Sequence, residues 1–132
     1  MKLLSLLAIT GLVLLMPLAA YGSEHFSVKE YNHFHDVLRP LQHEALPNKD
    51  WGRIRLNADE LVKRGKAIVK VGVPAGLPTT TGDDFRKELK KFKNALNKFN
   101  RDAKGGSDGA LEASFAVVHD SFEMLAGLLP RK

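Results

Sequence analysis

Large apolar residues recur along most of the chain in alternating steps of three and four. The clearest stripe consists of Leu111, Phe115, Val118, Phe122, Leu125 and Leu129. This spacing follows the turn of an α-helix and places all six side chains on one face. Stripes of the same kind occupy roughly residues 28–46, 51–72 and 82–104. The pattern therefore predicts an all-α domain, an antiparallel up-down four-helix bundle.

Residues that favour helix ends lie close to the ends of these stripes. Pro40 lies inside the first stripe and is expected to kink that helix or loosen one of its turns. Polar side chains that accept hydrogen bonds from first-turn amides are the usual N-caps. The expected caps are Ser27, paired with Glu30 in a capping box, then Asp50 or Asn48, then Thr81, and finally Ser107 or Asp108.

The second stripe contains small residues at regular intervals, Ala58, Gly65 and Gly72. A glycine inside a helix costs about 1 kcal/mol relative to alanine, so Gly65 needs an offsetting reason. Close approach of a neighbouring helix is one explanation. Room for a bulky cofactor is the other.

Residues 1–22 have the pattern of a secretory signal peptide. Lys2 precedes a mostly apolar run from Leu3 to Met16, and small residues allow cleavage after Ala20 or Gly22. A membrane anchor is the alternative, although the run is shorter than the roughly 20 residues of a spanning helix. We expect a bundle domain over 23–132, a periplasmic or secreted location, and no stable membrane insertion after cleavage.

Composition excludes several classes of activity. The chain has no cysteine, which rules out thiol nucleophiles and thiolate zinc sites. It also lacks a GxSxG elbow, a glycine-rich phosphate loop and an HExxH motif. Ser121 follows His119 and Asp120 directly, but neighbours at that spacing on a helix point away from each other. We therefore expect a protein that is not an enzyme.

The histidines are the main candidates for chemistry, and the chain has five: His25, His33, His35, His43 and His119. His35 and His119 occupy corresponding positions beside their stripes. In an up-down bundle the first and last helices are antiparallel neighbours, and a register with His35 opposite His119 overlaps them along nearly their full lengths. The sequence predicts a copper, zinc or nickel site of these two imidazoles, with Glu123 or His43 assisting. The alternative is that both histidines are structural, hydrogen-bonded to each other or to carboxylates.

The third predicted helix has a strongly basic outer face. Its cations are Arg86, Lys87, Lys90, Lys91, Lys93, Lys98, Arg101 and Lys104. Such a face is either solvated or directed at an anionic partner. No aromatic residue interrupts it, and export argues against nucleic acid, so we expect no nucleic-acid binding. The sequence leaves open a homodimer.

Helix number, length and order, together with the sequence AVVHD around His119, resemble the cytochrome c′ and cytochrome b562 group. The cytochrome c′ type carries CxxCH at this place. Here both cysteines are missing, so covalent haem is excluded. The b562 type implies non-covalent haem held by a methionine on the first helix and the histidine that His119 matches. The first helix has no methionine, so only His35 could supply the second ligand.

Three functions follow from these patterns. The first is an exported bundle that binds a transition metal for sequestration, transport or sensing. The second is non-covalent haem binding and electron transfer. The third is a structural or chaperone-like helical module whose basic face meets anionic partners.

Overall fold

The computed structural model describes residues 25–131 of the chain. Four α-helices and one π-helical segment fill most of that range: α1 (Lys29–Pro40), η2 (Leu41–Ala45), α2 (Trp51–Val71), α3 (Thr79–Gly105) and α4 (Asp108–Leu128). No strand occurs between residues 25 and 131, so the prediction of an all-α fold with four helices is confirmed for these residues. The predicted signal peptide, 1–22, lies outside the described residues.

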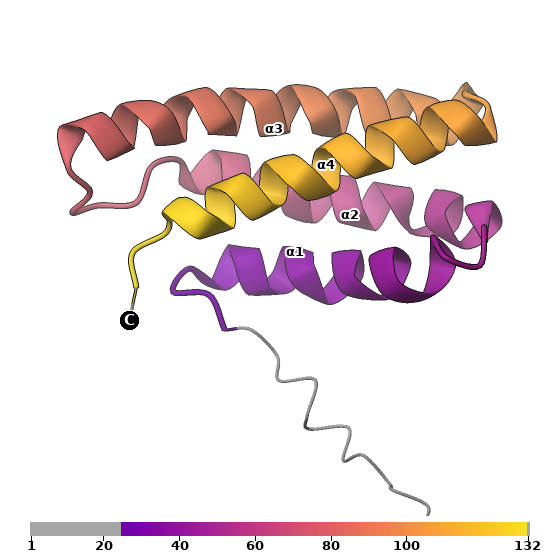
Figure 1. Cartoon of the computed structure of the whole chain (residues 1–132), viewed down its shortest axis with the longest axis horizontal. Helices are drawn as coiled ribbons and strands as arrows, with labels where there is room; N and C mark the ends of the chain where they lie inside the picture. The colour runs from indigo at the N-terminus through magenta and orange to yellow at the C-terminus, as the bar shows by residue number, and fades with distance from the viewer. Residues whose placement is uncertain (1–24, 132) are drawn as a thin grey trace, which may run out of the picture.

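The helices pack as a chain of neighbours. α3 packs along both α2 and α4, and α1 packs along α2. Figure 1 shows α4 lying across the bundle at an angle, close to α3 at its start and nearer to α1 at its end. Among the helices of residues 25–131, none is long and apolar enough to cross a bilayer.

The predicted stripes supply the core. Every large residue of the fourth stripe up to Leu125 is fully buried, and the same holds for the phenylalanines of α3 on its stripe. The largest buried side chains are aromatic: Tyr31, Phe34, Phe85, Phe92, Phe99, Phe115 and Phe122. With no disulfide, burial of these rings is the main source of stability, because each removes a large apolar area from water.

Pro40 widens the first helix, as predicted. Pro40 ends α1, and the next five residues form the π-helical turn η2, where the Leu46 amide donates to the Leu41 carbonyl at 2.8 Å. Proline has no amide hydrogen and its ring crowds the preceding turn. A π-helical turn is a common way for a helix to absorb such a disturbance.

Two of the predicted caps are present and two are not. Asp50 accepts from the Arg53 amide and Ser107 accepts from the Ala110 amide, both at 3.1 Å. The Ser27–Glu30 capping box is wrong, because the N-cap is Val28 and has no side-chain cap bond. The entry to α1 is instead held by the side chain of Asn32, which accepts from the Phe26 amide and donates to the Phe26 carbonyl.

The start of α3 was also predicted too late. Thr81 does not cap this helix, which begins at Thr79 with Pro78 as N-cap. The backbone of Pro78 is extended, with φ −55° and ψ 150°. The three threonines then enter the first turn, where unbonded amides are tolerated.

The C-terminal end of α3 is held by an arginine from α2. The Arg55 guanidinium donates to the carbonyls of Asp102 and Ala103 at 3.0 Å and of Gly106 at 2.9 Å. It also pairs with the Asp108 carboxylate at 3.0 Å. The last carbonyls of a helix lack intrahelical amide partners, and a planar cation with five N–H donors can bind several at once. The Asp102 carbonyl also accepts from the Gly106 amide at 2.9 Å. Arg55 therefore ties α2 to the link between α3 and α4.

Gly65 lies where α2 packs tightly against α3. A Cβ built on Gly65 would lie 2.5 Å and 2.7 Å from the two methyl carbons of Leu96. Leu96 is itself buried, so its side chain fills the space that the glycine leaves. Close helix packing thus accounts for Gly65, and Leu96 occupies the space that the alternative explanation assigned to a cofactor.

We expect Gly65→Ala to lower the free energy of unfolding by about 1 kcal/mol, because crowding Leu96 costs about 1–3 kcal/mol and the gain in helix propensity is only about 1 kcal/mol. Gly127→Ala is the matched control, since a Cβ on this helical glycine meets nothing within 4 Å. It should be neutral or stabilising. Urea unfolding of both variants checks this, and a Gly65→Ala protein at least as stable as the parent would contradict it.

Candidate functional site

Phe122 of α4 is the point where α4 meets α1. Its ring lies 4.8 Å from that of Phe34, 5.6 Å from Phe26 and 5.8 Å from Tyr31, measured between ring centroids. The imidazole of His35 stacks on the same ring at 6.1 Å, with 18° between the two planes. One side chain of α4 is therefore surrounded by the aromatic residues at the start of α1.

These contacts fix how far α1 is shifted along α4. Phe122 lies level with residues 31–35 of α1, and His119 precedes Phe122 by three residues. Three residues are less than one helical turn, so His35 and His119 lie about one turn apart along the seam. The predicted register agrees with this within one turn, but the α4 ring against His35 is that of Phe122, and the ring of Phe26 also packs on His35 at 5.6 Å.

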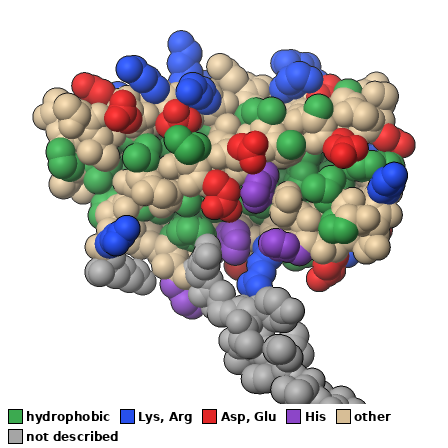
Figure 2. All heavy atoms as spheres, viewed as in Figure 1, with side chains coloured by type: hydrophobic (Ala, Val, Ile, Leu, Met, Phe, Trp, Pro, Cys, Tyr) green, Lys and Arg blue, Asp and Glu red, His purple; other side chains and the backbone are tan. Residues whose placement is uncertain are grey.

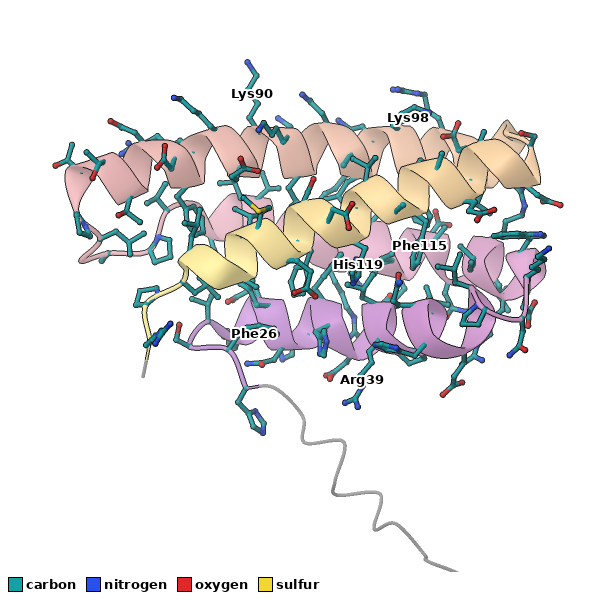
Figure 3. All side chains as sticks on the ribbon, in the orientation of Figure 1. Phe26, Arg39, Lys90, Lys98, Phe115 and His119 are labelled. Atoms are coloured by element: carbon teal, nitrogen blue, oxygen red, sulfur yellow. The ribbon has the colours of Figure 1, made fainter. Side chains whose placement is uncertain are left out.

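His119 lies on the side of α4 that faces α1 (Figure 3). Its side chain is 27% exposed and has a carboxylate near each ring nitrogen. Nδ1 is 3.3 Å from Oδ1 of Asp120, and Nε2 is 3.7 Å from Oε1 of Glu123. The second pair spans four residues, the spacing that brings side chains together on a helix. The structure thus brings together two of the predicted ligands, His119 and Glu123.

The other predicted ligands are less closely grouped. His35 is partly buried on the Phe122 ring, and His43 is exposed on η2 beside Glu44, whose carboxylate pairs with Arg53 at 2.9 Å. Within residues 25–131, no group of three or more His, Asp or Glu side chains is arranged to hold a metal ion. Of the predicted ligands, His119 and Glu123 have donor atoms 3.7 Å apart.

Charge is divided between two halves of the bundle. α4 has four acidic residues and no basic one, and α1 with η2 has three acidic and two basic residues. α2 and α3 together have fourteen basic and six acidic residues. We call α1, η2 and α4 the acidic half and α2 with α3 the basic half. In Figure 2 the histidines lie over α1 and α4, while lysines and arginines project from the edge formed by α3, where some acidic side chains also lie.

All five histidines lie on the acidic half or directly before it. The sequence contains this division, but the charged residues of separate helices become neighbours only in the folded bundle. It was not part of the sequence prediction, which considered only the basic face of the third helix.

The chain matches no protein-family profile, no curated protein and no solved structure. The resemblance to the cytochrome c′ and b562 group therefore stays a prediction. The candidate site must be judged on its own geometry.

Tyr31 adds an unusual polar group to the Phe122 cluster. Its side chain is fully buried, and its hydroxyl has no hydrogen-bond partner in the described part of the structure. Burial disfavours the phenolate and so raises the pKa of Tyr31 well above its ordinary value. A buried hydroxyl without a partner destabilises the folded state, because it loses its hydrogen bonds to water.

We expect Tyr31→Phe to raise the free energy of unfolding by about 1 kcal/mol at neutral pH, since it removes this unsatisfied hydroxyl. Because the folded pKa of Tyr31 is raised, the parent should lose stability as the pH rises above about 10, where the unfolded phenol ionises. The variant should lack that part of the alkaline loss. Thermal unfolding at several pH values checks both points, and a variant less stable than the parent by 1 kcal/mol or more would show that the hydroxyl has a partner.

Proposed function

We propose that this chain is an exported, antiparallel up-down four-helix bundle that binds a transition-metal ion between α1 and α4. His119 and His35 are the proposed nitrogen ligands, Glu123 the oxygen ligand, and His43 the alternative assisting group. The role would be sequestration, transport or sensing of the metal. One observation carries the proposal: His119 and Glu123 approach each other on the seam where Phe122 holds His35 about one turn away.

On α4, only small side-chain movements are needed to bring His119 and Glu123 to the spacing of two ligands of one metal ion. Two atoms bound to one zinc ion at about 2.1 Å lie roughly 3–3.5 Å apart. The Nε2 to Oε1 distance between His119 and Glu123 is 3.7 Å, and both side chains have exposed surface that leaves room to rotate. The His35 ring would turn from the face of Phe122 toward His119. Water would complete the coordination, and imidazole with carboxylate suits copper, zinc or nickel.

The charge of the acidic half favours a cation at this place. Of the seven carboxylates of α1, η2 and α4, two pair with arginines of α2, and the other five share these elements with two basic side chains. A surface with an excess of one charge raises the local concentration of the opposite ion. This supports a metal ion more than an anionic ligand at the seam.

Non-covalent haem, with His119 and His35 as axial ligands, is the alternative. The space between α1, α3 and α4 near this seam is filled by aromatic rings, since Phe34 packs on Phe122 at 4.8 Å and on Phe92 at 5.4 Å. A porphyrin would have to displace these rings, whereas an ion at the edge of the seam would not. The packing therefore favours the ion.

Calorimetric titration with copper, zinc and nickel salts tests the proposal. We expect one site per chain for at least one metal, weakened at least tenfold in His119→Ala and in His35→Ala because each removes a ligand. Glu123→Gln should have a smaller effect, since one oxygen ligand of reduced charge remains. His33→Ala is the matched control, because His33 is exposed on the same helix two residues from His35.

Two results would contradict the proposal. One is metal binding that is equal in the parent, His119→Ala and His35→Ala. The other is absence of binding together with an unchanged melting temperature in the presence of each metal, since a ligand of the folded state must raise it. A Soret band after addition of haem, lost in His119→Ala, would support the haem alternative.

A further inference from the structure

We propose that the basic half of the bundle docks on an anionic phospholipid surface through one face formed by α2 and α3. This basic face is defined by Lys63, Lys66 and Lys70 of α2 and Lys90, Lys93 and Lys104 of α3, all of them exposed. It does not include the histidines, and the proposal does not depend on metal binding.

The packing of α2 on α3 brings these lysines onto one surface. Gly65 of α2 packs against Leu96 of α3, and Lys66 follows Gly65 directly. Because α2 and α3 run in opposite directions, this contact places Lys70 level with the turn between Lys90 and Lys93. The cations of both helices therefore lie along the same seam.

A shallow groove runs along part of this seam. It has a volume of about 330 Å³ and is lined by Asp59, Val62, Lys63, Lys66, Asn100 and Lys104. Three of its six lining residues are lysines, from both helices, and Asp59 is its one carboxylate. A lipid phosphate in this groove would meet ammonium groups from two sides.

The lysines of the basic face form few short ion pairs. Within residues 25–131, none of Lys63, Lys66, Lys70, Lys90 and Lys93 lies within 4.0 Å of a carboxylate oxygen, and Lys104 approaches Asp59 only to 3.9 Å. On the opposite side of α3, by contrast, Lys91 pairs with Glu88 and Lys98 pairs with Asp102. The lysines of the basic face are therefore less engaged in ion pairs than Lys91 and Lys98, and Figure 3 shows Lys90 projecting from α3 into solvent.

The chemistry of the face fits a phospholipid surface better than a nucleic acid. Arg86 and Arg101 of α3 are exposed on the same side of that helix. Six of these eight cations are nevertheless lysines, which act as point charges without the planar fork that binds phosphates or bases in one geometry. The aromatic residues of α3 are buried, so none is available to stack on bases. A loose array of lysines over two adjacent helices is instead suited to many mobile headgroups.

The separation of the bundle into an acidic half and a basic half would also orient the domain on the lipid surface. An anionic surface attracts the basic half and repels the acidic half, so α1 and α4 would point away from the lipid. The side with His35 and His119 would then remain accessible from solution.

Co-sedimentation with vesicles tests the proposal. The probes are vesicles of equal parts phosphatidylglycerol and phosphatidylcholine, and vesicles of phosphatidylcholine alone. We expect binding to the first at about 50 mM salt, loss of binding at about 500 mM salt, and no binding to the second. Each lysine near such a surface is worth about fivefold in affinity, so Lys66→Glu with Lys93→Glu should weaken binding at least twentyfold.

Lys29→Glu with Lys87→Glu is the matched control, because it changes the net charge equally at two exposed lysines outside the basic face. It should weaken binding by no more than about threefold. Unfolding of both double variants, followed by circular dichroism, confirms that they are folded.

Three outcomes would overturn the proposal. Equal losses in the two double variants would mean that only net charge matters. Binding to neutral vesicles would point to the apolar N-terminal segment instead. Tighter, salt-sensitive binding to single-stranded DNA than to the anionic vesicles would make a nucleic acid the partner of this face.

Discussion

The packing of Phe122 among the aromatic residues of α1 is the interaction on which the arrangement of the last helix depends. α4 is supported along its length by α3, but its link to α1 is made by side chains, with the Phe122 ring at the centre. Replacing a buried phenylalanine by alanine typically costs about 3–5 kcal/mol. The same ring carries His35 on its face and lies three residues from His119. The position of the candidate site therefore depends on the packing of α4 on α1.

Much of the fold was predictable because helix periodicity is a local property. The stripes predicted the four helices and their buried faces, Asp50 and Ser107 were identified as caps, and Pro40 as the place where the first helix changes. The errors come from competition between nearby groups. Asn32 rather than a Ser27–Glu30 capping box holds the start of α1, and α3 begins two residues before Thr81. Sequence spacing does not determine which of several nearby polar side chains forms the hydrogen bond at a helix N-terminus.

The sequence predicted where the candidate residues lie along the helix axes, but not which side chains contact one another. Spacing along one helix predicted that His119 and Glu123 would meet, and the helix overlap placed His35 within one turn of them. The contact between Phe122 and His35 depends on side-chain packing between two helices. The position of a residue beside its stripe does not specify such packing. The division into acidic and basic halves has a similar cause, because charges from helices far apart in sequence become neighbours only in the fold. This division gives the bundle two different surfaces, and it underlies both proposals.

The central claim is that α1 and α4 each supply an imidazole to one metal ion. Pulsed electron paramagnetic resonance of the copper(II)-loaded protein tests it most directly, because couplings to the remote nitrogens of bound imidazoles report how many histidines bind. The account predicts couplings from two imidazoles in the parent and from one in His35→Ala and in His119→Ala. Couplings from a single imidazole in the parent, or two that persist in both variants, would contradict it.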